Sequence, residues 1–333
     1  MPQQNSRPTR PLLKWAGGKR QLLPELRRHY PQHFDRYIEP FFGSGAVFFD
    51  LLNSGRLHGR SAKLADLNPD LVGCYLAVRD DVEAVIRSLQ TLASGHAGQR
   101  GSDFYYMVRD RFNILRSAGG LRGLYTPDMA AMLIYLNRTG FNGLFRQNRD
   151  GEFNVPAGRY TNPRICDPEH LRAVALAWQQ RGVSISLTSF DATLAEAGRG
   201  DFVYCDPPYA PLSRTASFAH YMAGGFTAFD QVRLQQAVFA AAKRGAAVVV
   251  SNSSAAEIVT GYSAHEALAA GLVVRRVDAR RAINADARLR GTVEELVISN
   301  VAVAERMERI ASATRSRPTM LKAGVREKKV RSA

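Results

Sequence analysis

The segment YIEPFFGSGAVFFDLL, residues 37–52, decides the fold that we expect. Residues 37–40 have the apolar character of a short buried strand, and residues 46–52 have that of a helix. The glycines of FGSG (42–45) permit a tight turn between them. A second strand is expected at 61–67, so the chain opens as a strand, a glycine turn, a helix and a strand.

The second half of the chain returns to this alternation. Strands are expected at 183–189, 201–205, 246–251, 273–278 and 293–300. A helix expected at 229–243 separates two of them, whereas residues 280–291, which join the last two, have no helical pattern. Parallel strands joined by helices predict an α/β fold with a doubly wound, mostly parallel sheet.

Residues 75–180 interrupt the alternation and are predicted to form an inserted, mainly helical domain. Helices are expected at 81–92, 104–115, 127–136 and 168–180. Residues 137–162 are rich in Arg, Asn, Gly and aromatic side chains and predict a hairpin with a turn near 148–151. We therefore divide the chain into a flexible tail (1–10), a sheet domain (11–74 and 181–304), the insert (75–180) and a basic, disordered tail (305–333).

The composition points to a polyanionic partner. Lysine and arginine number 45 against 30 acidic residues, and the formal net charge of +15 favours nucleic acid over a membrane surface. No run of 18 apolar residues and no signal peptide is visible, so we expect a cytoplasmic protein. The three cysteines and seven scattered histidines lack the spacing of a disulfide framework or a metal site, and no metal is expected.

The tetrapeptide Asp206-Pro207-Pro208-Tyr209 directly follows the strand expected at 201–205 and suggests the chemistry. The prolines end the strand, because proline cannot continue a hydrogen-bonded ladder. The Asp206 carboxylate and the Pro207 carbonyl can both accept from one exocyclic amine, and Tyr209 offers a flat face for a ring. Adenine or cytosine suits such a site. Two acceptors on the amine would direct the nitrogen lone pair toward an electrophilic methyl group on a sulfonium.

Three further segments fit a nucleotide or nucleic-acid site. The glycine turn at 42–45 lets backbone approach a ligand, and Asp66 at the end of the next strand could hold ribose hydroxyls, although the third glycine of the dinucleotide fingerprint is missing. KWAGGK (14–19) could hold an anion at a helix start, or be an ordinary loop. Arginines and aromatics interleave in 137–160 and could contact phosphates and bases, or pack as a loop in water.

Together these segments resemble the Dam family of N6-adenine DNA methyltransferases. The matching strings are LKWAGGK (13–19), EPFFGSGAVF (39–48), ADLN (65–68), YLNRTGFNGL (135–144), GEFNVPAGRY (151–160), VYCDPPYAPLS (203–213) and SNS (251–253). The resemblance implies the S-adenosylmethionine-dependent methyltransferase fold, with 11–74 and 181–304 as catalytic domain and 75–180 as DNA target-recognition domain. It also implies S-adenosylmethionine as methyl donor, S-adenosylhomocysteine as product, and N6 of an adenine flipped out of duplex DNA as acceptor.

The resemblance also assigns roles to individual residues. The catalytic residues would be Asp206, Pro207, Pro208 and Tyr209. The cofactor pocket or its edge would be formed by Trp15, Lys19, Glu39, Phe41, Gly43, Gly45, Asp66, Phe190, Asp191 and Asp206. Contacts to DNA would come from Lys14, Phe141, Asn142, Leu144, Arg146 and Pro156, and we add Arg138 because it lies among the arginines of 137–160. By the same analogy the target is GATC, with Lys14 touching its first guanine and Arg146 reading a guanine.

Alternatives remain open at this point. The tetrapeptide serves any aromatic amine, so adenine at another site, adenine in RNA or N4 of cytosine could be the acceptor. A catalytically inactive DNA-binding relic is disfavoured by the intact motifs, and a nicotinamide-dependent dehydrogenase by the missing glycine and the positive charge. Departures from the family pattern at Ser253-Ser254 and 285–289 bear on the DNA sequence preferred. We expect a monomer in solution, and the sequence does not indicate whether a restriction nuclease accompanies it.

Overall fold

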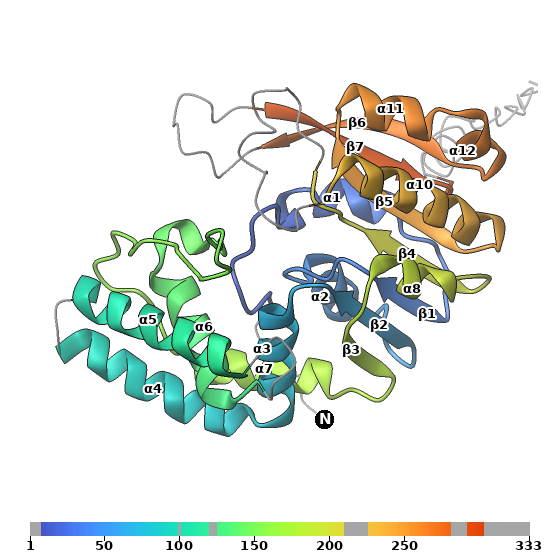
Figure 1. Ribbon diagram of the computed structural model, residues 1–333. Coiled ribbons are helices and arrows are strands. Elements are labelled where there is room, and N and C mark those ends of the chain that lie inside the picture. The colour runs from blue at the N-terminus through green and yellow to red at the C-terminus, as the bar shows by residue number, and fades with distance from the viewer. Residues whose placement is uncertain (1–7, 99–100, 120–124, 210–225, 281–291, 303–333) are drawn as a thin grey trace, which may run out of the picture.

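A seven-stranded sheet forms the centre of the molecule (Figure 1). The computed structural model describes residues 8–98, 101–119, 125–209, 226–280 and 292–302. The strands are β1 (Arg36–Glu39), β2 (Ser61–Asp66), β3 (Val183–Leu187), β4 (Asp201–Cys205), β5 (Ala247–Ser253), β6 (Val273–Arg280) and β7 (Thr292–Ser299). Strands β1 to β5 are parallel, whereas β7 runs antiparallel to its neighbours β5 and β6. The expected α/β fold with a mostly parallel sheet is confirmed.

The strand order, β3-β2-β1-β4-β5-β7-β6, changes direction between β1 and β4. The chain adds β2 and β3 on one side of β1, and then adds β4 and β5 on its other side. In an open sheet of this kind, ligands bind in the crevice at the carboxyl ends of the two strands that flank the change. Glu39 ends β1 and Asp206 follows β4, so both carboxylates lie at this crevice.

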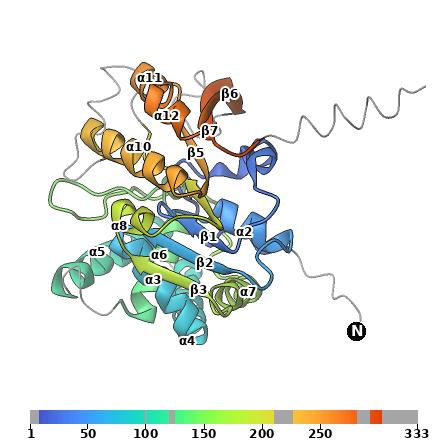
Figure 2. The same cartoon turned by 90° about the vertical axis from the view of Figure 1, so that its right-hand side faces the viewer.

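Helices cover both faces of the sheet, and each face has its own hydrophobic core. Along β4, Phe202 and Tyr204 belong to the core shared with α2, α3 and α7, whereas Val203 and Cys205 belong to the core shared with α8, α10 and α11. Because side chains alternate between the two faces, every residue of β4 is buried. Figure 2 shows α8 and α10 on one side of the sheet, with α2 and α7 on the other.

The helices that accompany the sheet differ in length. They are α1 (Leu23–Leu26), α2 (Ala46–Asn53), α3 (Pro69–Asp80), α7 (Pro168–Trp178), α8 (Phe190–Ala195), α10 (Ala228–Lys243), α11 (Ala256–Tyr262) and α12 (His265–Ala269), with short 3-10 turns at η1 (Lys19–Gln21) and η2 (Arg27–His29). The helices expected at 46–52, 168–180 and 229–243 are confirmed. None of the described helices is long and apolar enough to cross a membrane.

The inserted segment contributes α4 (Val82–Gly98), α5 (Gly101–Gly119) and α6 (Pro127–Thr139), which pack together beside the sheet (Figure 1). Most of α6 is buried because α3, α4 and α5 all pack against it. The expected boundary at residue 75 falls inside α3, a helix that the sequence pattern did not indicate. Arg116 of α5, which is partly buried, pairs with buried Asp70 of α3 at 2.9 Å, so this ion pair ties the insert to a sheet helix.

The segment after α6 folds back on itself as the sequence predicts. Antiparallel bridges join Gly140 to Ala157 and Gln147 to Phe153, and a 3-10 turn, η3 (Phe141–Gly143), begins the segment. The turn expected near 148–151 is present, because the Gly151 N–H donates to the Asn148 carbonyl at 3.1 Å. We call residues 140–157 the hairpin below.

Candidate active site

Asp206, directly after β4, is contacted by side chains from two other segments. The ammonium of Lys19 lies 2.9 Å from Asp206 Oδ1, and Ser251 of β5 donates to the same oxygen at 2.9 Å. Ser251 in turn shares a 3.0 Å hydrogen bond with the hydroxyl of Tyr204. Burial raises the pKa of Asp206, while the cation of Lys19 and the hydrogen bond from Ser251 oppose this shift.

Lys19 occupies the space between the carboxylate of Asp206 and the ring of Tyr209. Its Nζ lies 4.5 Å from the ring centroid and also donates to the carbonyl of Gly17. The side chain is only 7% exposed. The expectation placed Lys19 at the edge of a cofactor pocket. The structure joins it to Asp206, which was expected at the same pocket edge as well as at the substrate amine, and to the ring face of Tyr209.

The loop that carries Pro207, Pro208 and Tyr209 is braced by residues that the sequence patterns did not indicate. Gln231 of α10 donates to the Pro208 carbonyl at 2.9 Å. The hydroxyl of Tyr209 donates to Glu295 of β7 at 2.7 Å. Within the described part of the chain, no hydrogen bond reaches the Pro207 carbonyl, so this oxygen is available to an incoming donor.

The glycine turn after β1 has a geometry that requires its glycines. Gly43 and Gly45 have positive φ values, +46° and +69°. A Cβ on Gly45 would lie 2.4 Å from the ring of Phe42, and one on Gly43 would lie 3.1 Å from Trp15. Glycine at these two positions lets the Phe42 ring and Trp15 pack directly against the backbone of the turn.

Two carboxylates frame this turn at the ends of β1 and β2. Glu39 is 2% exposed and accepts from the Tyr37 hydroxyl at 2.9 Å, and burial raises its pKa well above the usual range. Asp66 accepts from the Gly43 N–H at 2.9 Å and from the Asn68 N–H. Asp66 thus supports the turn itself, in addition to any contact with a ligand.

Aromatic rings gather beside the turn. Phe41 stacks on Phe190 of α8 with ring centroids 5.5 Å apart, and Phe226 contacts both rings. Asp191, the next residue of α8, pairs with Arg233 of α10. The resemblance to the Dam family indicated Phe41, Phe190 and Asp191, but neither Phe226 nor Arg233.

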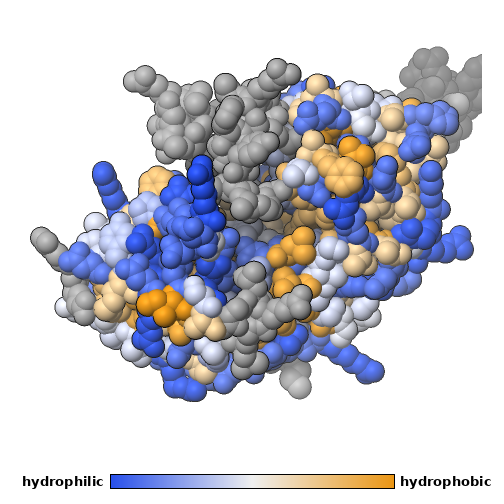
Figure 3. Space-filling model, in the orientation of Figure 1, coloured by the Kyte–Doolittle hydropathy of each residue, from blue (hydrophilic) through white to orange (hydrophobic). Residues whose placement is uncertain are grey.

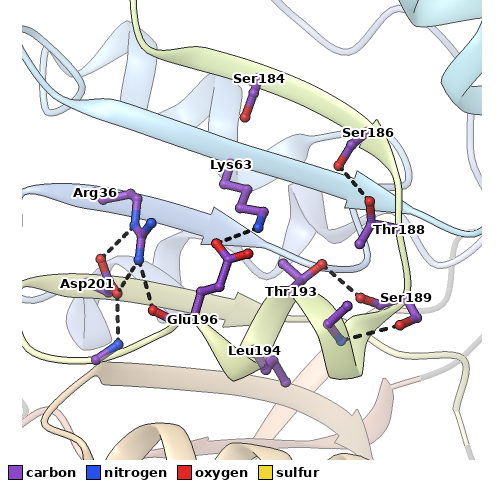
Figure 4. Close-up of polar contacts among 12 residues, drawn as sticks. Arg36, Lys63, Ser184, Ser186, Thr188, Ser189, Thr193, Leu194, Glu196 and Asp201 are labelled. Carbon is purple, nitrogen blue, oxygen red and sulfur yellow. Dashed lines mark hydrogen bonds and ion pairs between the residues drawn. The ribbon is translucent and has the colours of Figure 1, made fainter.

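Helix α8, which presents Phe190 and Asp191, is fixed by a set of polar contacts (Figure 4). Ser189 caps its first turn by accepting from the Ala192 N–H, and the hydroxyl of Thr193 donates to the Ser189 carbonyl at 2.8 Å. Just beyond its end, Glu196 pairs with Lys63 of β2 at 2.7 Å. A six-residue helix is therefore held at both ends in a set orientation.

The segment around Lys14 joins the hairpin to the sheet. The backbone N–H and carbonyl of Lys14 both bond to the side-chain amide of Asn137 at 2.8 Å. Trp15 stacks on Phe145 with ring centroids 5.6 Å apart. The structure thus brings the KWAGGK segment against Asn137 of α6, 123 residues away in the sequence, and against Phe145 of the hairpin.

The hairpin presents several of the expected DNA-contacting residues to solvent. Phe141 is 42% exposed, and Arg146 and Pro156 are exposed. Arg146 donates through Nε to Asn154 at 2.8 Å, whereas Leu144 and Asn142 are partly buried. Hydrophilic residues dominate this part of the surface in Figure 3.

The site combines two features. Asp206, two prolines and Tyr209 follow the carboxyl end of β4, and a glycine turn follows the neighbouring strand β1. A family model described as D12 class N6 adenine-specific DNA methyltransferase matches residues 15–275. The chain belongs to this family. It is therefore a DNA (adenine-N6)-methyltransferase, and the predicted Dam-type family is confirmed.

Curated relatives match over nearly their whole length. The chain is 34% identical over 301 residues to the type II methyltransferase M1.LlaDCHI of Lactococcus lactis subsp. cremoris, covering 90% of this chain and 98% of the relative. It is 36% identical over 300 residues to the type II methyltransferase M.MjaIII of Methanocaldococcus jannaschii, covering 87% and 99%. It is 33% identical over 288 residues to the DNA adenine methylase of Escherichia coli (strain K12), covering 86% and 94%.

Arg138 of the D12 methyltransferase is placed differently from Arg146. It lies in the last turn of α6, is partly buried and donates to the Leu12 carbonyl at 2.8 Å. Burial and the neighbouring Arg10 lower its pKa. This geometry favours a role in holding the N-terminal segment, so the predicted DNA contact gains no support from the position of this side chain.

Membership of this methyltransferase family implies S-adenosylmethionine as donor and DNA as substrate. The described residues contain no group of three or more His, Cys, Asp or Glu arranged to hold a metal ion.

Proposed function

We propose that this D12 enzyme methylates N6 of an adenine flipped out of duplex DNA, with Asp206, Pro207 and Tyr209 receiving the base. The observation that carries this proposal is the position of the cation Lys19 Nζ, which lies 2.9 Å from the Asp206 carboxylate and 4.5 Å from the centroid of the Tyr209 ring. The Pro207 carbonyl, which no described group bonds, is the second acceptor that we propose. Inside a stacked duplex N6 cannot be approached in line, so the base must leave the stack.

The position of the Lys19 ammonium indicates what this site stabilises. A nitrogen that loses electron density to a methyl group becomes positive, and the site already holds a positive nitrogen between a carboxylate and an aromatic face. The adenine amine would take this place, with one hydrogen on Asp206 and the other on the Pro207 carbonyl. Both acceptors favour a lone pair that points away from them.

Bound S-adenosylmethionine supplies an electrophilic methyl group on a sulfonium. The nitrogen–carbon bond would form as the sulfur–carbon bond breaks and leaves S-adenosylhomocysteine, and the amine proton would pass to the Asp206 carboxylate or to water during or after transfer. The enzyme's residues mainly position the amine and hold its developing charge, so no histidine base is needed.

The turn after β1 fits the cofactor. Gly43 and Gly45 permit the left-handed backbone of the turn, Trp15 packs on Gly43, and Glu39 and Asp66 flank the turn. The family positions Phe41, Phe190 and Asp191 line the adjoining aromatic cluster. Tight binding of S-adenosylmethionine to the purified protein, and its loss in the variant Asp66→Ala with the fold intact, would support this assignment.

For DNA we propose that the hairpin and Lys14 contact the target, that GATC is the sequence, and that 75–180 acts as target-recognition domain in a monomeric enzyme. Exposed Phe141, Arg146 and Pro156 support the hairpin's role, since nothing in the described chain covers them fully. The identity of the recognised sequence rests on the Dam resemblance. Cytosine N4 is disfavoured because the matching family is adenine-specific.

The test is single-molecule sequencing of plasmid DNA from a methylation-deficient host that expresses this chain. N6-methyladenine in one motif is expected. If that motif is not GATC, the recognition part of the proposal is wrong, whereas an absence of methylated adenine with folded protein present would contradict the activity itself.

The matched variant is Asp206→Ala in the same host. Methyl transfer should be lost, because one acceptor for the amine is removed, while DNA binding measured by fluorescence anisotropy stays within about threefold. Turnover near that of the wild type would show that Asp206 does not hold the amine.

A further inference from the structure

The hydroxyl of Tyr209 is held by a residue from the far end of the sheet. Tyr209 donates to Glu295 Oε2 at 2.7 Å, although the two residues lie 86 positions apart. Strand β7 is antiparallel to β5 and pairs Glu295 with Ser253. Its first residues therefore reach the edge of the sheet where β4 and β5 end, and where Asp206 follows.

Three described side chains lie against Tyr209: Glu295 and Ser251 at its hydroxyl, and Lys19 at its ring. Glu295 holds the hydroxyl, and the ammonium of Lys19 lies 4.5 Å from the ring centroid. A base that stacks on this ring and bonds to Asp206 must take the place of the ammonium. The contacts of the hydroxyl then remain, and of these the bond to Glu295 is the one to a carboxylate.

We propose that Glu295 is a positioning residue for methyl transfer, which holds the Tyr209 ring at the angle where the flipped adenine stacks with N6 directed at Asp206. This inference rests on the role proposed above for Asp206 and Tyr209. Glu295 itself touches neither the base nor the methyl group in this arrangement. It acts through the tyrosine hydroxyl.

The direction of the hydrogen bond supports this assignment. Burial, and then the charges of Asp206 and Glu295, raise the pKa of Tyr209 well above the usual range. The tyrosine therefore keeps its proton and donates it to the carboxylate. A hydrogen bond to a charged acceptor is stronger and shorter than a neutral one, so it resists rotation of the ring.

The neighbouring residue on β7 provides a matched control. Glu294 pairs with Arg276 of β6 and has a side chain that is 42% exposed. Successive residues of a strand point to opposite faces, so Glu294 lies on the other face of the sheet from Glu295. Glu294→Gln makes the same change of charge one residue away without touching Tyr209.

The experiment compares Glu295→Ala, Glu295→Gln and Glu294→Gln with the wild-type enzyme. The substrate is an unmethylated duplex that contains the motif in which the enzyme methylates adenine. Glutamine keeps an acceptor for the tyrosine hydroxyl, whereas alanine removes it. We expect kcat to fall about tenfold in Glu295→Ala and to stay within about threefold of wild type in the two glutamine variants. The KM for S-adenosylmethionine should change by less than about twofold, because the cofactor contacts are untouched.

A second readout follows the base itself. With 2-aminopurine at the target position, stacking on Tyr209 quenches its emission, so the bound complex of Glu295→Ala should be brighter than those of Glu295→Gln and Glu294→Gln. If Glu295→Ala only destabilised the fold, its melting temperature and its binding of DNA and S-adenosylmethionine would fall. The 2-aminopurine emission of the bound complex would then stay as in the wild type.

Three results would overturn the inference. They are a wild-type kcat in Glu295→Ala, equal losses in Glu295→Ala and Glu295→Gln, and equal 2-aminopurine emission in all variants. The variant Asp206→Ala shows whether the role of Glu295 or the proposed function itself is wrong. If Asp206→Ala is inactive while Glu295→Ala behaves as wild type, only the role of Glu295 is wrong.

Discussion

Asp206 shows how the surroundings of a single carboxyl group set its chemistry. Burial raises its pKa, whereas the Lys19 cation and the Ser251 hydroxyl oppose the rise. Only the ionised form offers both oxygens as acceptors, so activity should fall as the pH drops through this raised pKa. The acidic limb of kcat/KM is therefore expected above the ordinary aspartate value of about 3.9.

The variant Ser251→Ala tests this electrostatic account. Its hydroxyl donates to the charged carboxylate, so its removal disfavours the ionised form and should move the acidic limb to still higher pH. Ser186→Ala, in which the lost hydroxyl lies on β3 and bonds to Thr188, is the control and should leave the limb in place. Identical profiles for the two variants would show that Ser251 does not tune Asp206.

The site residues that the sequence indicated lie in short local motifs, whereas those that it missed lie inside regular elements. Asp206, Gly43 and Gly45 stand in short motifs at strand ends, where turn residues and a carboxylate have few structural uses. Gln231 and Glu295 lie inside a regular helix and a regular strand, in no local pattern. Their partners are 23 and 86 residues away, and only the folded chain reveals such contacts.

At the scale of elements, the glycine turn after β1 makes a prediction about stability. Gly45→Ala places a methyl group 2.4 Å from the Phe42 ring at a φ of +69°. Gly55 has a similar φ, +73°, with nothing within 4 Å, so Gly55→Ala isolates the backbone strain, about 1–2 kcal/mol. Gly45→Ala should lower the free energy of unfolding by a further 1–3 kcal/mol or so, from overpacking.

Urea unfolding of the two alanine variants measures this difference. Equal losses of stability would show that the ring of Phe42 moves aside without cost, and that only the backbone conformation requires glycine at this turn.

A further prediction concerns the hairpin and the DNA sequence preference of the enzyme. If Arg146 forks onto a guanine, Arg146→Ala should cost about 1–3 kcal/mol at one base pair and relax the sequence preference there. Arg149 is exposed at the turn of the same hairpin, and Arg149→Ala should weaken binding equally on all sequences. Competition binding with single-base-pair variants of the motif separates the two. A uniform loss for Arg146→Ala would make it a phosphate contact.

The sequence predicted some helices and missed others, and the difference has physical reasons. α10 begins with a capping box at Thr227 and Asp230, and α6 and α7 begin with proline, so their local signals are strong. α3 also begins with a cap and a proline, at Asn68 and Pro69. It was missed because it is buried on several sides between the sheet and α6, so its apolar residues do not form one stripe. α8 has six residues, too few for a periodic pattern.

At the scale of the whole molecule, the charge of +15 and the family together predict how binding responds to salt. Each phosphate that Lys or Arg neutralises releases counterions, so the logarithm of the binding constant should fall linearly with the logarithm of salt concentration, by about 0.9 per phosphate. Fluorescence anisotropy of a labelled duplex between low and moderate salt gives the slope.

Two control measurements show whether this slope reports contacts between the protein and DNA phosphates. Arg149→Ala should reduce it by about one if the exposed guanidinium contacts a phosphate. Binding of S-adenosylmethionine, measured over the same range, should change little, because the site that we propose for it consists mainly of the carboxylates Glu39 and Asp66, backbone and aromatic rings rather than of a basic surface. A flat response for DNA would mean that the positive charge of the chain does not face the duplex, and the interface would then have to lie elsewhere than the arginine-rich hairpin.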